Sequence, residues 1–285
     1  MIRLARRIAL SSLTLTASLW FAYLLLANGA LLLAPRMIDR REPVTMSFDA
    51  YTLLPGTVHV QNFQMHVEDR WTQWSLEIAN ASVRVSVLPV LKRTFHAQKV
   101  DAYGVVMRLR MKRTTDELAN APEGAYPDIP GMGPPLRNDL RFPFGRPLKN
   151  PWTLQMENIT AHAQQIWIEG ERFDGAAMAE GQFRMAFDRE VEVGPTELQI
   201  ESGTLQHRGT ELAQELRGAL SIKLGPFNPR RVRDGAVAEQ LSVNGELHAS
   251  PRKNSKFDAV VALERGVLKQ GTSVDVSLPG VKKNF

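Results

Sequence analysis

Six histidines and a few scattered carboxylates are the side chains of this chain best suited to chemistry. No two histidines have the His-x-x-x-His spacing, and none has the Glu-x-x-His spacing, that puts metal ligands on one face of a helix. His59 and His66 lie in stretches whose apolar–polar alternation has opposite phase. We therefore predict no metal site and no bound cofactor. The histidines are His59, His66, His96, His162, His207 and His248.

Sequence motifs for catalysis are also missing. The chain has no Gly-x-Ser-x-Gly turn, no phosphate-binding loop and no dinucleotide fingerprint. Asp49, Asp101, Asp174 and Glu201 are scattered, mostly beside predicted turns, and no spacing pairs two of them for acid–base work. The absence of cysteine excludes disulfides and thiolate metal ligands. We predict that the protein is not an enzyme and has no catalytic residues.

The first element that could position a site is a stretch of 26 uncharged residues, Ile8–Leu33. A helix of about 20 apolar residues spans a bilayer core, so this stretch predicts a single transmembrane helix with its core at Leu15–Leu33. A cleaved signal peptide, cut near Ala27-Asn28-Gly29, is the alternative. With one span, the default orientation leaves the N-terminus in the cytoplasm and exports the body. The basic residues flanking the stretch are Arg3, Arg6, Arg7, Arg36, Arg40 and Arg41.

The net charge of +5 belongs to the region around the anchor. Residues 1–41 hold six of the 35 basic residues and one of the 30 acidic ones, which leaves a body with 29 of each. The basic flanks can contact lipid headgroups, whereas the neutral body has no basic stripe for nucleic acid. We therefore predict membrane lipids, and no nucleic acid, as partners.

After residue 42 the apolar residues alternate with polar ones, as in Val83-Arg84-Val85-Ser86-Val87. This period of two is typical of strands with one apolar and one solvated face. The phase changes near Gln61-Asn62 and Ala79-Asn80, which we interpret as turns or bulges. The sequence predicts a mainly β fold, in which repeated antiparallel strands follow the N-terminal transmembrane helix and form a curved sheet, a groove or a sandwich.

Further strands and few helices are predicted along the rest of the chain. Apart from the anchor, helical signals are limited to a short turn near Leu88–Arg93 and a segment at Glu211–Leu216. The later strands are predicted at 152–160, 164–169, 181–187, 190–193, 197–201, 219–224, 240–249, 257–264 and 272–278.

Residues 112–151 interrupt this pattern with eight prolines and four glycines. Such a composition disfavours both a helix and a sheet ladder, so we predict a long loop or linker between two sheet segments. A proline motif that binds a partner is the alternative. The predicted organisation is an anchor with basic flanks at 1–41, a first β unit at 42–111, the proline-rich linker at 112–151 and a second β unit at 152–285.

Two short segments 78 residues apart resemble each other. The residues at 74–82, Trp-Ser-Leu-Glu-Ile-Ala-Asn-Ala-Ser, align with Trp-Thr-Leu-Gln-Met-Glu-Asn-Ile-Thr at 152–160. We expect each copy to form one strand, to turn at Asn80 or Asn158 and to begin another strand. The similarity indicates two related β units, as in repeat architectures, with a chance match as the alternative.

Several segments together resemble the AsmA-like family of Gram-negative envelope proteins. They are the N-terminal span, Leu-Pro-Gly at 54–56, Val-x-Val-x-Asn-Phe at 58–63, Trp-Ser-Leu-Glu-Ile at 74–78, the run at 81–93 and Leu-Arg-Gly-Ala-Leu-Ser-Ile at 216–222. The resemblance covers most of residues 1–225 and implies an inner-membrane protein with a cytoplasmic N-terminus and a periplasmic body. Larger TamB-like relatives are similar to long β grooves implicated in moving phospholipid, and this chain is shorter.

The apolar strand faces carry the functional prediction. If the sheet curls, they could line a concave, apolar surface for acyl chains; otherwise they pack as a core. We predict a non-catalytic protein for envelope lipid handling or outer-membrane homeostasis, with phospholipid as its partner. The alternative is a structural or assembly scaffold that docks another envelope protein through its sheet edge or proline-rich loop. The candidate lipid-facing residues are Val83, Val85, Val87, Val105, Met107 and Leu109.

Overall fold

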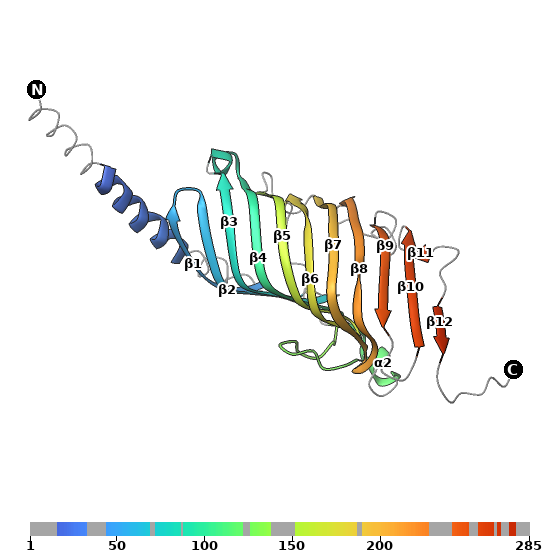
Figure 1. Ribbon diagram of the computed structural model, residues 1–285. Helices are drawn as coiled ribbons and strands as arrows, with labels where there is room; N and C mark the ends of the chain where they lie inside the picture. The colour runs from blue at the N-terminus through green and yellow to red at the C-terminus, as the bar shows by residue number, and fades with distance from the viewer. Residues whose placement is uncertain are drawn as a thin grey trace, which may run out of the picture.

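The structure is a computed structural model in which an N-terminal helix precedes one large, curved β-sheet (Figure 1). Strands lie side by side and bend along their length, with the blue helix next to the first strand (Figure 1). The structure describes residues 16–32, 44–68, 72–86, 88–121, 126–137, 152–186, 190–227, 241–250, 256–264, 267–268 and 274–277.

In the described part of the chain the sheet has twelve strands, and two short helical elements lie in the connections before and after β4. The helical elements are the 3₁₀ helix η1 (Leu88–Lys92) and the α-helix α2 (Thr115–Ala119). The strands are β1 (Val44–Leu54), β2 (Thr57–Glu68), β3 (Thr72–Ser86), β4 (Thr94–Met111), β5 (Thr153–Ile168), β6 (Glu171–Ala186), β7 (Glu190–His207), β8 (Thr210–Phe227), β9 (Leu241–Ser250), β10 (Lys256–Glu264), β11 (Val267–Leu268) and β12 (Val274–Ser277).

The strands follow one another in chain order across the sheet from β1 to β11, and β12 pairs with β10. All the described pairs are antiparallel except β4 and β5, which are parallel and therefore need a crossover between them. The first and last strands of this order do not pair with each other, so the sheet is open. The predicted mainly β fold with a curved sheet is confirmed. The sandwich alternative is wrong for the described strands, because all of them belong to one sheet.

The strands are longer than the sequence predicts, because single residues inside them shift the alternation. The predicted strands 152–160 and 164–169 are one strand, β5, and those at 190–193 and 197–201 are both part of β7. A residue with positive φ lies at four of the phase changes: Asn62 (51°), Gly104 (67°), Asn158 (45°) and Glu215 (51°). These positions act as bulges, so the predicted phase change at Gln61-Asn62 is a bulge and not a turn.

The predicted helical segment at Glu211–Leu216 is wrong, because these residues lie within β8. Ala213 and Leu216 are both buried in one apolar cluster although they are three residues apart. This spacing resembles a helical period, but Glu215 between them has a φ of 51°, which returns the next apolar side chain to the same face of the strand. The short turn predicted near Leu88–Arg93 is confirmed as η1.

The proline-rich segment contains a helix, contrary to the prediction. In α2, Thr114 caps the first turn: the Glu117 N–H donates to its hydroxyl, while the Thr114 N–H donates to the Glu117 carboxylate at 2.6 Å. That backbone hydrogen bond lowers the pKa of Glu117. The helix is possible because it lies before Pro122. Arg113 also pairs with Leu136 in an isolated parallel bridge, so the segment is not a bare linker.

The two similar segments form matching parts of β3 and β5, which lie on either side of β4. The expected turn at Asn80 or Asn158 is wrong, since both strands continue through the asparagine. In both copies the apolar alternation changes phase there instead. The sheet continues through the β4–β5 pair, across the predicted linker, and the boundaries of the two β units stay a prediction.

The N-terminal helix is described over residues 16–32. Within the described parts of the chain, no helix combines the length and apolar content that crossing a membrane needs. Residues 8–15 and Leu33 of the predicted span, and its arginine flanks, lie outside the described residues. The transmembrane helix therefore stays a prediction.

Candidate functional site

One side of the sheet is apolar across nine strands. Residues paired directly across neighbouring strands point to the same side, so the register defines rows of side chains. Three such rows contain only apolar residues and glycine, and we call the side that carries them the inner face. The rows are Met46, Met65, Leu76, Met107, Ile166, Phe173, Leu205 and Ala213; Phe63, Ile78, Val105, Ala163, Ala177, Ile200, Gly218 and Leu247; and Ala50, Val60, Ala81, Ala102, Ala161, Ala179, Leu198, Leu220 and Gly245.

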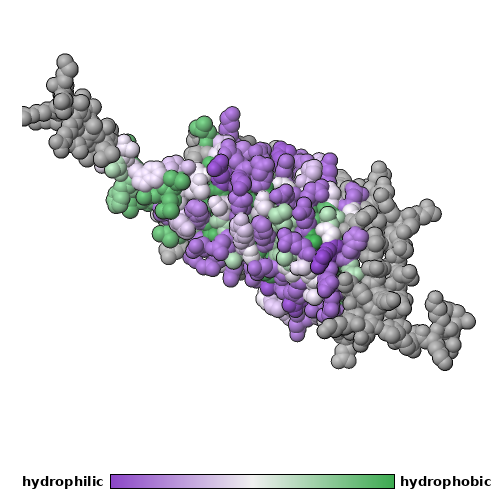
Figure 2. Space-filling model, in the orientation of Figure 1, coloured by the Kyte–Doolittle hydropathy of each residue, from purple (hydrophilic) through white to green (hydrophobic). Residues whose placement is uncertain are grey.

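The opposite side, the outer face, is polar in the same region. Figure 2 shows a mostly hydrophilic surface over the sheet, whereas the N-terminal helix beside it is hydrophobic. The bulges preserve this division, because without them every side chain beyond a phase change would move to the wrong face. One outer row that crosses the same nine strands consists of Tyr51, His59, Ser82, Asp101, Thr160, Glu180, Glu197, Ser221 and Asn244.

Five of the six predicted lipid-facing residues lie together on the inner face. Val83 and Val85 belong to β3, and Val105, Met107 and Leu109 belong to the adjacent β4. Val105 is buried, Met107 is 36% exposed and the other three are half-buried. Val87 lies outside the described residues. The structure thus places these side chains on one apolar surface, and their contact with lipid stays a prediction.

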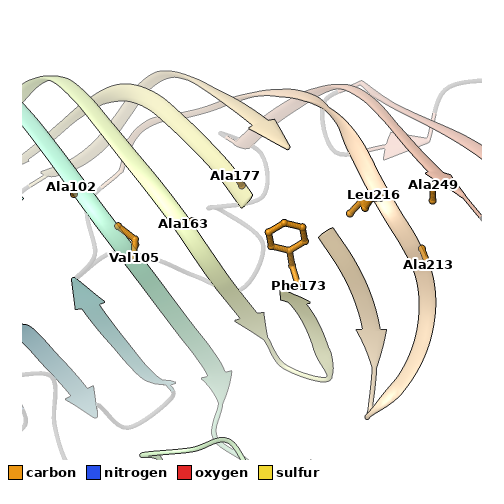
Figure 3. Close-up of a cluster of buried hydrophobic side chains, with 8 residues drawn as sticks. All are labelled: Ala102, Val105, Ala163, Phe173, Ala177, Ala213, Leu216 and Ala249. Carbon is orange, nitrogen blue, oxygen red and sulfur yellow. The ribbon is translucent and has the colours of Figure 1, made fainter. Parts of the chain in front are cut away.

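One row of the inner face consists of alanines across four neighbouring strands. Ala81, Ala102, Ala161 and Ala179 form one row from β3 to β6, the next row contains Val105, and Met107 belongs to the row after that. Small residues let the strands bend inward without steric conflict. Figure 3 shows the strands bent around this face, so the inner face is concave, and we call its alanine row the alanine floor.

Part of this concave face is closed by its own side chains. Eight buried residues from β4, β5, β6, β8 and β9 form one cluster: Ala102, Val105, Ala163, Phe173, Ala177, Ala213, Leu216 and Ala249. In Figure 3, Val105, Phe173 and Leu216 point into the space enclosed by the bent strands. Nearer the strand ends the inner face is open to solvent, since Phe95 is 40% and Ile168 is 45% exposed. The face thus combines a packed centre with accessible apolar margins.

The N-terminal helix is fixed to the edge strand β1 by side-chain hydrogen bonds. The Asn28 amide pairs with the backbone of Thr52 as a neighbouring strand would, accepting from its N–H at 2.8 Å and donating to its carbonyl at 3.1 Å. The Tyr23 hydroxyl lies 3.1 Å from the Thr52 hydroxyl. Thr52 is only 2% exposed. We call this contact the Asn28 clamp; it holds the helix at the β1 end of the concave face.

The helix leaves most of its apolar side chains uncovered. Leu19, Phe21, Leu25, Leu26 and Leu32 are each more than 60% exposed. An apolar helix surface of this extent on a water-soluble protein would favour association with another apolar phase. The side of the helix that carries these exposed residues is available to such a phase.

The proline-rich segment packs on the outer face, on the side opposite the apolar rows. Arg110, 2% exposed, donates to the Gln73 side-chain oxygen at 2.8 and 3.1 Å and to the carbonyls of Pro127 and Gly133. Burial lowers the pKa of Arg110, although nearby carboxylates oppose this effect. These bonds tie the described part of the segment to β3 and β4 on the outer face.

A second buried cation lies beside the first. The Lys112 ammonium, whose side chain is fully buried, is 2.8 Å from the Glu68 carboxylate. Burial raises the pKa of Glu68, but the hydrogen bond and the charge of Lys112 outweigh it and leave this pKa below its ordinary value. The pair joins the end of β2 to the start of the proline-rich segment.

The histidines do not assemble into a site. His59 and His66 both lie on the outer face, because the bulge at Asn62 cancels the phase difference seen in the sequence. Among the residues that the structure describes, no group of three or more His, Asp or Glu side chains is arranged to hold a metal ion. His96 and His207 each lie within 3.0 Å of a single carboxylate, Glu157 and Glu171 respectively.

Comparison with protein-family models and with curated proteins finds no match to this chain. The resemblance to the AsmA-like family therefore rests on the quoted sequence segments alone. Sequence reasoning also missed the Asn28 clamp, although a polar Asn inside the uncharged apolar stretch is a signal that could have indicated it. No comparable signal in the sequence indicated which residues Arg110 and Lys112 contact.

Proposed function

We propose that this protein is a membrane-anchored, non-catalytic protein of the cell envelope that handles phospholipid on its inner face. The observation that carries the proposal is the set of three adjacent rows without one polar side chain, which together extend from β1 to β9. Ligand surfaces for apolar molecules are concave and lined mainly by apolar side chains. In this proposal, acyl chains lie against the inner face and displace the water that now reaches its margins.

The dimensions of the inner face suit acyl chains. Strands in a sheet are spaced by about 4.8 Å, so nine strands extend for about 40 Å. The hydrocarbon core of a bilayer is about 30 Å thick, so the acyl chains of one leaflet extend for about 15 Å. The inner face is longer than one acyl chain, and it can therefore hold more than one lipid along its length.

The proposed position relative to the membrane follows from the Asn28 clamp. If the N-terminal helix inserts into the inner membrane, the Asn28 clamp holds the β1 end of the inner face at the bilayer. The sheet then extends away from that end as a groove in the periplasm, with the N-terminus in the cytoplasm. The exposed apolar side chains of the helix, such as Leu25 and Leu26, support this arrangement.

The proposal is tested by the lipid that purifies with the full chain. We expect mass spectrometry of the purified protein to detect bound phospholipid. Met107→Asp puts a charge on an accessible part of the inner face, and we expect it to reduce bound phospholipid by about tenfold, equivalent to about 1.4 kcal/mol.

The matched control is Leu212→Asp, which changes an apolar side chain of β8 that is 55% exposed and belongs to none of the three apolar rows. We expect this variant to retain its lipid, and circular dichroism checks that both variants keep the β fold. Absence of bound phospholipid from the unmodified chain, or equal loss in the two variants, would contradict the proposal.

The scaffold alternative draws on a different feature, the open edge of the sheet. β1 is an edge strand, and Asn28 occupies its backbone only at Thr52. The stretch at 44–51 could accept an added strand from an envelope protein. Crosslinking from this stretch in intact cells separates the two proposals: a dominant protein partner together with unchanged function of Met107→Asp would favour the scaffold.

A further inference from the structure

A small cavity lies on the outer face, under the proline-rich segment. Its volume is about 280 Å³, and Gly131 of that segment forms part of its lining. Six polar side chains from two neighbouring rows of β1, β2 and β3 line it: Thr45, His66 and Ser75 in one row, and Ser47, Gln64 and Glu77 in the next. This outer cavity is separated by the sheet from the inner face, so its role is independent of lipid handling.

Buried polar atoms without partners mark this cavity. His66 Nδ1 and Ser75 Oγ are both buried and make no hydrogen bond, and Ser75 is only 7% exposed. Arg108, paired with Ser75 in the same row, has a buried Nε that is likewise unsatisfied. Native proteins pair nearly all such groups, so the two unsatisfied atoms that line the cavity, with Arg108 Nε next to them in the same row, indicate a place where another molecule supplies the missing bonds.

The size and chemistry of the cavity restrict what that molecule can be. One water molecule occupies about 30 Å³, so the cavity is too large for a single bridging water. Ligand pockets range upward from about 300 Å³, so this cavity is at the lower limit and suits only a small molecule. The lining offers hydroxyl, amide, imidazole and carboxylate groups, and the guanidinium of Arg108 neutralises Glu77. A mixed set of donors and acceptors without net charge matches alcohol hydroxyls better than an ion.

We propose that the outer cavity binds a neutral polyhydroxylated ligand of the size of one sugar ring. Hydroxyl groups of the ring can donate to His66 Nδ1 and to the Glu77 carboxylate, and can accept from Ser75 and Gln64. The site lies at the membrane-anchor end of the sheet, between the first three strands and the proline-rich segment. Sugar binding would therefore place a glycan close to the β1 end of the protein.

The test uses the full chain in a detergent without a sugar headgroup. Saturation-transfer NMR with D-glucose and with N-acetyl-D-glucosamine is expected to show transfer from protein to sugar. Ser75→Ala removes a hydroxyl that has no partner in the protein, so the fold should tolerate it. We expect this variant to raise the Kd for the sugar by about 3- to 10-fold, the effect of one hydrogen bond.

Gln64→Ala is the second variant, at an exposed side chain, and we expect an increase in Kd of similar size. The matched control is Ser82→Ala, which changes a serine on the outer side of the same strand, β3, that does not line the cavity. Its Kd should equal that of the unmodified chain. Absence of saturation transfer from both sugars overturns the proposal, and so does an unchanged Kd in both Ser75→Ala and Gln64→Ala.

Discussion

Single glycine residues decide how closely the strands approach on the inner face. A Cβ on Gly175 would lie 2.2 Å from the Ser202 carbonyl oxygen and 2.4 Å from the Gly203 Cα, both of which are backbone atoms. Because backbone atoms of β7 cannot move aside without breaking the ladder, we expect Gly175→Ala to destabilise the protein by about 1–3 kcal/mol. Thermal unfolding followed by circular dichroism measures the effect.

The matched control is Gly133→Ala in the proline-rich segment, where an added Cβ would meet no atom within 4 Å. We expect its unfolding temperature to stay close to that of the unmodified chain. Equal unfolding temperatures for Gly175→Ala and the unmodified chain would show that β6 and β7 are less tightly apposed than described.

The ion pair between Glu68 and Lys112 predicts a pH dependence. The pKa of Glu68 is lower in the folded protein than in an unfolded chain, so the pair stabilises the fold above the unfolded pKa of about 4.3. This stabilisation is lost as the pH falls through the lower, folded pKa. We expect Glu68→Gln to lower the unfolding temperature at pH 7, and the difference from the unmodified chain to shrink between about pH 5 and pH 3.

Glu77→Gln provides the comparison for this pH series, because Glu77 is a more exposed carboxylate on the neighbouring strand and its partner is Arg108. A temperature difference for Glu68→Gln that stays constant down to pH 3 would rule out the described ion pair as its source.

At the scale of elements, the Asn28 clamp joins the N-terminal helix to β1 through two hydrogen bonds to Thr52. Each such bond contributes about 1 kcal/mol, and Asn28→Ala removes both. We expect the helix to separate from the strand and the Thr52 amide to exchange its hydrogen faster, as measured by hydrogen–deuterium exchange. Asn28→Asp keeps the acceptor but loses the donor, so its exchange rate should be intermediate.

Ser18→Ala is the control, since Ser18 lies on the same helix and is exposed. Its Thr52 amide should exchange at the rate of the unmodified chain. If Asn28→Ala left that rate unchanged as well, the clamp would not hold the helix against the sheet.

The strands show what sequence could and could not predict. The apolar–polar alternation predicted the β architecture. It also predicted one shared apolar surface for Val83, Val85, Val105, Met107 and Leu109. It could not tell a turn from a bulge, because both appear as a phase change. Only pairing with a neighbour decides whether a strand continues through such a residue.

Long-range contacts escaped prediction for a related reason. Arg110 and Lys112 occupy polar positions of an alternating strand, which predicts that they are exposed to solvent. Both are instead buried under the proline-rich segment. Their partners, Gln73 and Glu68, lie about 40 residues earlier in the chain. The sequence around Arg110 and Lys112 does not indicate which face of the sheet a segment returning from later in the chain will cover.

At the scale of the whole molecule, the sheet is open, continuous and two-sided. The β4–β5 pair lets the inner face continue from one half of the chain to the other, and the described part of the crossover packs on the outer face through Arg110. A closed barrel or a sandwich would seal the apolar rows inside. An open, bent sheet instead leaves them accessible from its margins, which is the property that lipid handling requires.

The length of the inner face leads to a prediction about stoichiometry. At about 40 Å it exceeds a single acyl chain of about 15 Å, so native mass spectrometry of the full chain should detect two or more phospholipids per molecule. Ala179→Phe adds a large ring to the alanine floor on β6 and should lower this number. Ala219→Phe, on the exposed outer side of β8, should leave it unchanged. One lipid per molecule in all three proteins would mean that lipid occupies a single site, and the continuous inner face would then serve packing along most of its length.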